Sequence, residues 1–253
     1  MSMACKPECK WHVPFRERGT SASQTLNFLW QYDRVYLMDN HLAALWCWLR
    51  HVSPDGPTSV FHIDRHYDAL PLPPDLAGMT PARVASMEIS DYLGERRVDR
   101  NQSVPVFRWD NYFSVFLNHS ASESRCRCVA ATHKKGDRPP DCCLQELETW
   151  DLQHNVEFFL RPSGQWIVNL DLDYFFCRAN GDRTIRFQSE EYVDEVFQAI
   201  AASYRDKAMA VLTVSLSPEC CGGWEESEKL CRRFFEAMAL PYPLPPVDRQ
   251  GGG

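Results

Sequence analysis

Side chains that could bind metal ions follow two short apolar stretches of the sequence. The first stretch ends in Asp64, His66 and Asp68, and the second ends in Asp171 and Asp173, each time at alternate positions. Alternate side chains of an extended strand leave from the same face. Two carboxylates on one face repel each other and lose solvation, so such a pair needs a cation or hydrogen-bond donors nearby.

Both apolar stretches have the pattern of buried parallel strands. Residues 59–63 lie between turn-forming segments at 53–57 and 71–74, and residues 166–170 are similarly apolar, with Asn169 on the alternation face of the acids that follow. Open α/β sheets usually place their sites at the carboxyl ends of such strands. A purely structural alternative is that these acids cap helices or are solvated.

A third candidate ligand follows a shorter apolar stretch, residues 35–38. Asp39 or Asn40 is a suitable N-cap for a helix over residues 42–49, which places His41 in the first turn, facing the strand ends. If the three strand ends are neighbours, four carboxylates and two imidazoles converge. That set has too many acids for a structural zinc site and suits a pair of Mn²⁺ or related ions.

The remaining sequence alternates between expected strands and helices. We expect further strands over residues 104–108, 156–160 and 210–216, and helices over residues 81–87, 91–97 and 111–118, after Ser189 and around Leu230, Phe234 and Met238. This order predicts one α/β domain with a mostly parallel sheet over residues 25–240. Residues 1–24 are expected to be an irregular lead-in, residues 120–145 a surface insertion, and residues 241–253 a tail outside the core.

The overall charge excludes some functions. The 253 residues carry a formal net charge of -7, which argues against a general nucleic-acid binder. Residues 1–18 lack the apolar core of a targeting segment, and no apolar stretch reaches membrane-spanning length. We therefore expect a cytoplasmic protein with no membrane partner.

The cysteines do not form a regular framework. There are eleven of them, an odd number, so reduced thiols are the expected state. Cys126, Cys128, His133, Cys142 and Cys143 could form a small zinc site, but their spacing matches no standard zinc module.

The order of the candidate ligands resembles the arginase/ureohydrolase superfamily. Residues 39–48, 61–68, 109–112 and 216–224 resemble more closely a divergent branch, the UPF0489 family, which includes peptide arginases that convert arginine residues of ribosomal precursor peptides to ornithine. The resemblance runs from about residue 35 to residue 230. It implies a three-layer α/β/α arginase-like fold, two Mn²⁺ ions per chain and an arginine-containing precursor peptide as partner.

The resemblance also implies a set of ligands. One ion would be bound by His41, Asp64, Asp68 and Asp171, and the other by His66, Asp64, Asp171 and Asp173, so that Asp64 and Asp171 bridge the two. A hydroxide shared between the ions would attack the guanidinium carbon, and urea would leave.

Residues outside the ligand set are expected to bind the substrate. Glu219 ends a late strand, as does the acid that orients the guanidinium group in arginases, and a carboxylate can pair with a guanidinium in bidentate fashion. Trp109, Asp110 and Asn111 are expected to line the pocket. The histidine that transfers protons in arginases has no clear match. His119 is our assignment, with His133 and His62 as alternatives, although His62 shares the alternation face of the metal ligands and fits a supporting position.

Three other functions stay open. The loops that bind the α-amino and α-carboxylate groups of arginine have no counterpart, which fits a peptide substrate, but a ureohydrolase for free arginine or agmatine is the first alternative. A deacetylase-like amidohydrolase with one zinc ion is the second. A non-catalytic protein that keeps the fold is the third, and the complete ligand set disfavours it, because buried acids without a function destabilise a protein.

Overall fold

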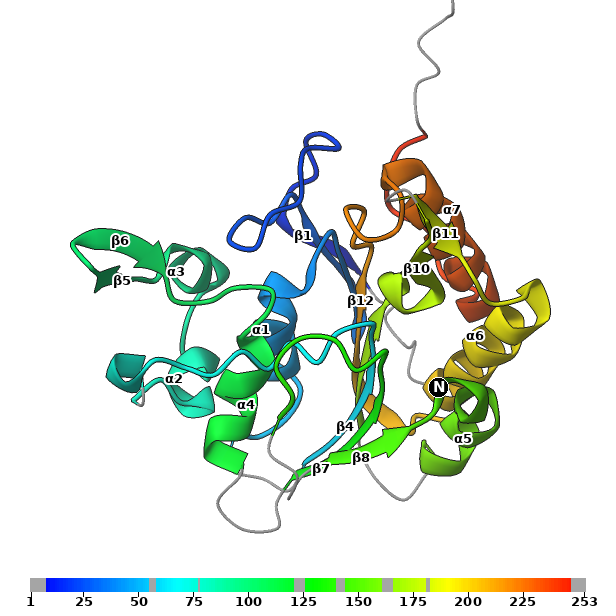
Figure 1. Ribbon diagram of the computed structural model, residues 1–253, viewed down its shortest axis with the longest axis horizontal. Helices are drawn as coiled ribbons and strands as arrows, with labels where there is room; N and C mark the ends of the chain where they lie inside the picture. Colours follow the sequence, from blue (N-terminus) through cyan, green and yellow to red (C-terminus); the bar gives the residue numbers. More distant parts are fainter. Residues whose placement is uncertain are drawn as a thin grey trace, which may run out of the picture.

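A single mixed sheet runs through the middle of the molecule (Figure 1). The computed structural model describes residues 8–54, 58–76, 78–120, 126–139, 144–160, 166–180 and 183–246, without the side chains of residues 118–120. Within these ranges the sheet has eight strands in the order β1-β2-β3-β12-β9-β4-β7-β8. The strands are β1 (Cys9–Val13), β2 (Leu29–Tyr32), β3 (Val35–Met38), β4 (Thr58–Ile63), β7 (Cys126–Ala131), β8 (Leu144–Leu147), β9 (Trp166–Asp171) and β12 (Met209–Ser215).

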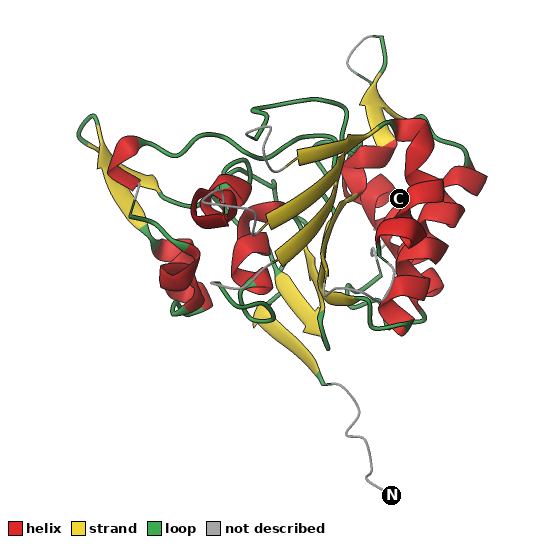
Figure 2. Cartoon of the chain, turned by 90° about the horizontal axis from the view of Figure 1, so that it is seen from below, coloured by secondary structure: helices red, strands yellow, loops and turns green. Residues whose placement is uncertain are grey.

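Helices cover both faces of this sheet (Figures 1 and 2). One face carries α1 (Ala44–Trp48), α2 (Pro81–Ala85), α3 (Ile89–Gly94) and α4 (Tyr112–Ser120), and the other carries α5 (Leu152–Phe159), α6 (Glu190–Arg205) and α7 (Trp224–Met238). Two small hairpins lie outside the sheet, β5 (Arg96–Asp99) with β6 (Gln102–Pro105), and β10 (Phe176–Arg178) with β11 (Thr184–Arg186). The predicted three-layer α/β/α architecture is confirmed.

Local sequence explains the best-defined elements. The hydroxyl of Ser189 accepts a hydrogen bond from the backbone N–H of Tyr192 and so caps α6, as predicted. Val196 and Ile200 on this helix, and Phe234 on α7, are fully buried against the sheet. The buried side chains form one cluster on each side of the sheet, which is the expected core of a layered domain.

The strand order brings the carboxyl ends of four parallel strands together. From β3 to β8, neighbouring strands pair in parallel, while β1 and β2 are antiparallel additions at one edge. Because β3, β12, β9 and β4 are consecutive neighbours, the segments that follow them lie at the same edge of the sheet. These segments carry His41, Glu219, Asp173 and Asp64.

Three predicted elements differ from the structure. Residues 120–145 include β7, an interior strand of the sheet, and are not only a surface insertion. Residues 156–160 belong mainly to α5, because short apolar runs fit a helix as well as a strand. The strand expected at 104–108 ends at Pro105 and pairs with β5 in a separate hairpin.

Both ends of the described chain also take part in the fold. Residues 9–13 form the edge strand β1 within the expected lead-in, and Ser21 is buried near the strand ends. Leu244, in the expected tail, is buried against the core. β1 joins the sheet by antiparallel pairing with β2, and Tyr242 in the expected tail packs edge-on against Phe235 of α7.

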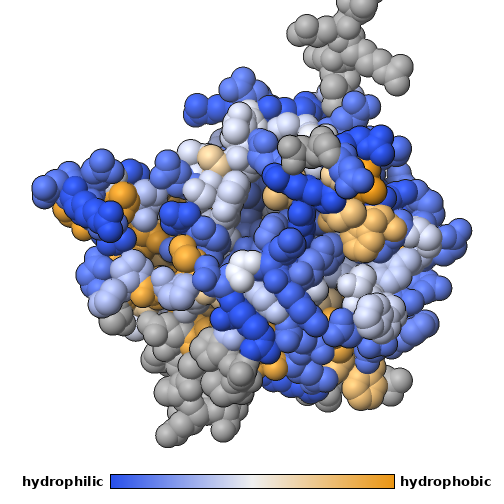
Figure 3. Space-filling view, in the orientation of Figure 1, coloured by the Kyte–Doolittle hydropathy of each residue, from blue (hydrophilic) through white to orange (hydrophobic). Residues whose placement is uncertain are grey.

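The outer surface is mainly hydrophilic. On the face shown in Figure 3, apolar residues gather on the left, over the side that carries α2, α3 and the β5–β6 hairpin. Among the described residues, no helix has the length and apolar character needed to cross a membrane.

Candidate metal centre

Asp64 lies at the centre of the convergent strand ends. Its side chain is completely buried. His41 Nε2 lies 3.2 Å from Asp64 Oδ2, and His66 Nδ1 lies 3.6 Å from Asp64 Oδ1. His66 Nδ1 is also 3.1 Å from Asp173 Oδ2. Residues from three separate segments of the chain therefore meet around one carboxylate.

These side chains form two groups that could each hold a metal ion. One group is His41, Asp64 and Asp68, and the other is Asp64, His66 and Asp173. In each group, one ligand atom per residue lies within 4.8 Å of the others. Asp64 belongs to both groups, which is the position that a bridging carboxylate would need.

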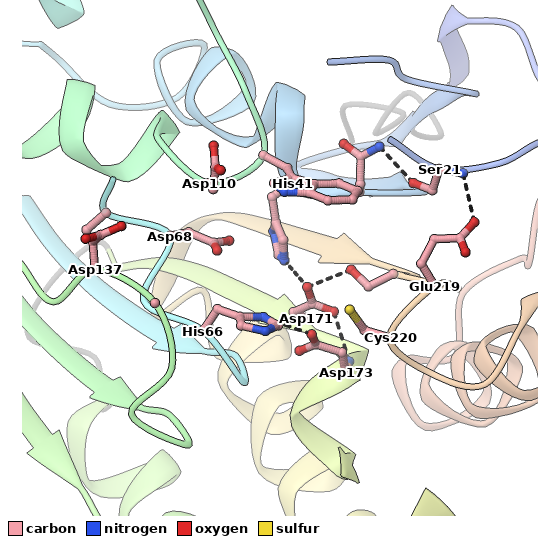
Figure 4. A pocket seen from close by; sticks show the side chains of 15 residues that line it. Ser21, His41, His66, Asp68, Asp110, Asp137, Asp171, Asp173, Glu219 and Cys220 are labelled. Carbon is pink, nitrogen blue, oxygen red and sulfur yellow. Dashed lines mark hydrogen bonds and ion pairs between the residues drawn. The ribbon is translucent and has the colours of Figure 1, made fainter. Parts of the chain in front are cut away.

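Asp171 is held somewhat differently from the other acids. Its Oδ2 contacts His41 Nε2 and accepts a hydrogen bond from Ser217 Oγ at 2.7 Å, and its Oδ1 accepts one from the Asp173 N–H at 2.9 Å (Figure 4). It adjoins both groups without being a member of either. Its assignment as the second bridge stays a prediction.

Local backbone features orient the ligands. The side chain of Asn40 accepts a hydrogen bond from the Leu42 N–H at 3.0 Å and so caps the 3₁₀ turn (His41–Ala43) that presents His41, as predicted. Asp68 has a left-handed backbone with φ of 52°, a conformation that aspartate tolerates better than most residues. This turn directs the Asp68 side chain back toward the pocket.

Burial and close charges shift the pKa values of the acids in opposite directions. Burial alone would raise the pKa of Asp64, but the close imidazoles of His41 and His66 outweigh it and hold the pKa below its usual value. Burial and the neighbouring carboxylates of Asp171 and Asp64 raise the pKa of Asp173 to about 7. Burial and Asp64 likewise raise the pKa of Asp68. The acids are therefore too close together to be all charged without cations.

Two buried atoms in this cluster have no hydrogen-bond partner within the described part of the chain. They are His41 Nδ1 and Asp64 Oδ2, and the contact of Asp64 Oδ2 with His41 Nε2 at 3.2 Å does not have hydrogen-bond geometry. A buried polar atom without a partner destabilises the fold, so such atoms in a native site indicate a missing ion or water. The carboxylate and imidazole donors fit Mn²⁺ or a related divalent ion, and neither group contains a thiolate.

Three buried polar residues, one on each of three adjacent strands, support the candidate ligands. We name them the polar row. Thr213, Asn169 and His62 occupy equivalent positions on the adjacent strands β12, β9 and β4. The Asn169 amide donates to His62 Nδ1 and to the Tyr112 hydroxyl, both at 3.1 Å, and accepts from Thr213 Oγ1 at 2.7 Å. His62 Nε2 lies 3.0 Å from the backbone oxygen of His66. His62 thus supports the loop of residues 64–68, which we name the ligand loop. This agrees with the supporting position expected from its alternation face.

Five of the six candidate ligands, all except the buried Asp64, line a pocket of about 260 Å³. The rest of the pocket wall is formed by residues from several loops, namely Ser21, Asn40, Ala69, Trp109, Asp110, Gly136, Asp137, Ser217, Glu219 and Cys220. Glu219 Oε1 accepts a hydrogen bond from the Ser21 N–H at 3.1 Å, which fixes the carboxylate at the wall. Burial, followed by the charges of Asp173 and Asp171, raises the pKa of Cys220, which keeps it a neutral thiol.

The expected substrate residues divide into two sets. Trp109 and Asp110 line the pocket, although Asp110 forms a two-point ion pair with Arg108 at 2.8 and 2.9 Å. Asn111 does not line it. The Asn111 amide accepts from the Arg108 N–H at 2.9 Å and donates to the Val106 oxygen at 2.9 Å. These two bonds give Asn111 a structural role in the loop, contrary to the expected substrate contact.

The histidines proposed for proton transfer lie outside this pocket or outside the described side chains. The side chain of His119 is not among those described. His133 packs against Tyr174 and Phe187 and does not line the pocket.

The eight cysteines that the structure describes form no disulfide with one another. Cys126 and Cys128 are on the buried strand β7, and the proposed partners Cys142 and Cys143 lie outside the described residues.

Several pocket residues were missed by sequence reasoning. Three of them follow strand ends, namely Ser217, Gly136 and Asp137. The sequence Lys-Gly-Asp at 135–137 is a turn signal, and it indicates that these residues lie near the edge of the sheet where the ligands are. Ser21 is brought to the pocket by the chain before β2 and has no such local signal.

No protein-family model matches the chain, and no curated protein matches it. Among solved structures, the arginase of Helicobacter pylori aligns with 78% of this chain and 68% of its own, at 14% identity and a TM-score of 0.42. At these values the likeness by itself assigns neither a family nor an activity.

Proposed function

We propose that this protein is a dinuclear manganese hydrolase that acts on the guanidinium group of arginine side chains in a ribosomally made precursor peptide. The products would be ornithine and urea. The observation that carries the proposal is the pair of ligand groups that share Asp64, beside a pocket whose wall holds Glu219. The resemblance of the ligand motifs to peptide arginases adds the substrate class.

The residues around the pocket have separate roles in this proposal. When bound, two divalent ions would supply Lewis acidity and an activated water. Glu219 would pair with the planar guanidinium and hold its carbon over the metal centre, since the Ser21 N–H already orients one carboxylate oxygen. Trp109 offers an aromatic surface for the same cation.

The polar row beneath the ligands would maintain their geometry. His62 bonds the backbone of the ligand loop, and Asn169 fixes the ring of His62. Such supporting bonds orient metal ligands and adjust metal affinity.

Product analysis tests the proposal. The purified protein with Mn²⁺ is incubated with an arginine-containing precursor peptide, and separately with free arginine and with agmatine. Loss of one CH₂N₂ unit per arginine from the peptide, with release of urea, supports the proposal. The Asp64→Asn variant and an EDTA-treated sample are the controls, and both should be inactive.

The alternatives predict different outcomes. Turnover of free arginine or agmatine, with no turnover of the peptide, would indicate a ureohydrolase for small guanidino compounds. One zinc ion per chain, with hydrolysis of an acetylated substrate, would indicate a deacetylase-like enzyme. Either result would refute the peptide arginase proposal.

A further inference from the structure

A second cavity lies beside the metal pocket. It is lined by Arg65, His66, Lys135, Arg178, Glu219 and Cys220 and has a volume of about 260 Å³. His66, Glu219 and Cys220 line the metal pocket as well (Figure 4). A molecule bound over the metal centre could therefore extend into this second cavity, which we name the basic cavity.

Three cationic residues from three segments give the basic cavity its charge. Arg65 lies between Asp64 and His66 in the segment that follows β4, and it lines the basic cavity together with His66. The Arg65 N–H donates to Asp173 Oδ1 at 3.1 Å, which fixes its backbone. Lys135 belongs to the loop after β7, where its oxygen accepts from the Tyr67 N–H at 2.9 Å, and Arg178 ends β10.

The described chain leaves two of these cations without a matching anion. Arg65 Nε is buried without a hydrogen-bond partner among the described residues. Lys135 forms no ion pair within the same ranges, and the one acid that lines the cavity, Glu219, already accepts from Ser21. Clustered positive charge attracts anions, and it is unusual in a protein of net charge -7. The cluster therefore indicates a site for an anionic ligand.

We propose that the basic cavity binds a carboxylate of the substrate while the arginine side chain occupies the metal pocket. This inference rests on the proposed function. The carboxylate could come from an acidic side chain near the target arginine or from the C-terminus of the peptide. Arginine and lysine bind carboxylates by charge-assisted hydrogen bonds, so both sources suit the same cavity.

A competing explanation is that the cations only balance the acids of the metal centre. In that case the loss of one cation would affect all substrates alike. A carboxylate subsite instead predicts an effect that depends on whether the peptide carries the carboxylate. This difference decides between the two explanations.

The test uses three fluorescently labelled peptides that contain one arginine. The first is neutral apart from the arginine and is amidated, the second carries one glutamate beside the arginine and is amidated, and the third ends in a free carboxylate. Affinity is measured by fluorescence anisotropy with the Mn²⁺-loaded protein, and urea release is measured in parallel.

The variant is Lys135→Gln and its matched control is Lys134→Gln. Lys134 is the adjacent residue, pairs with Glu148 at 2.9 Å and lines neither cavity. We expect wild-type protein to bind one carboxylate-bearing peptide about tenfold more tightly than the neutral one. Lys135→Gln should remove most of that preference, and Lys134→Gln should keep it.

The outcomes separate the inference from the proposed function. A preference for the glutamate peptide or for the free C-terminus identifies the source of the carboxylate. Equal affinity for all three peptides, or an equal loss for all three in Lys135→Gln, overturns the inference. A carboxylate preference without urea release from any peptide would support the subsite and refute the peptide arginase activity.

Discussion

Asn169 occupies the centre of the polar row beneath the metal centre, and its replacement by leucine separates packing from hydrogen bonding. The residue is fully buried, and leucine is of similar size. Asn169→Leu removes the donor to His62 Nδ1, the donor to the Tyr112 hydroxyl and the acceptor for Thr213 Oγ1. Thr213 keeps its bond from Trp48 Nε1 at 3.0 Å, so the loss falls mainly on the other two groups.

The size of the effect follows from these contacts. A buried polar group that loses its partner costs about 1–3 kcal/mol. Two such groups should therefore lower the free energy of unfolding by about 2 kcal/mol or more. For a chain of this size, each kcal/mol lowers the melting temperature by about 2–4 °C. Because His62 also holds the ligand loop, Mn²⁺ affinity should fall by about 10–100-fold.

Two measurements check this prediction. Denaturation in EDTA gives the change in stability of the metal-free protein, and isothermal titration calorimetry gives the Mn²⁺ affinity. Asn155→Leu is the control, since among the described residues the one bond of the Asn155 amide is to the backbone oxygen of Asp151, the residue before α5. A variant with lowered stability but unchanged Mn²⁺ affinity would show that the row does not support the ligands.

Three more predictions concern the metal centre and the core. Asp64→Asn should reduce bound manganese from about two ions to less than one per chain, measured by elemental analysis; two retained ions would exclude the bridge. EDTA should lower the melting temperature, because ions at 100 times their Kd stabilise by about 2.7 kcal/mol; an unchanged value would contradict a native ion site. Phe197→Ala should cost about 3–5 kcal/mol in urea denaturation, whereas Phe158→Ala, at a residue 59% exposed, should cost under about 0.5 kcal/mol; similar losses would refute the burial argument.

The parts of the fold predicted from sequence share strong local signals. The strands β3, β4, β9 and β12 are apolar runs between turn-forming residues, and polar residues follow each of them. Ser189 and the apolar spacing after it marked α6. Since parallel strands end at one edge, the candidate ligands come together if these strands are neighbours, and the order β3-β12-β9-β4 in the sheet meets that condition.

The errors have equally local causes. The β7 sequence combines cysteine, arginine and alanine, which have little strand preference, so tertiary pairing with β4 determines its conformation. Asn111 is polar and follows two pocket residues, but its amide oxygen and nitrogen both form hydrogen bonds with the backbone of its own loop. Sequence patterns do not show how a polar side chain is satisfied, and the basic cavity likewise depends on residues far apart in the chain.

The ladder between β4 and β7 continues past the strand ends. The N–H groups of Asp64, His133 and Tyr67 bond the oxygens of Ala131, Arg65 and Lys135 in turn. The loop that carries Lys135, Gly136 and Asp137 is thus attached to the ligand loop by backbone hydrogen bonds, which do not depend on side-chain identity. Side chains on the outer loop can therefore be exchanged during evolution while the ligand geometry is inherited unchanged, so selectivity for new substrates can arise without rebuilding the metal centre.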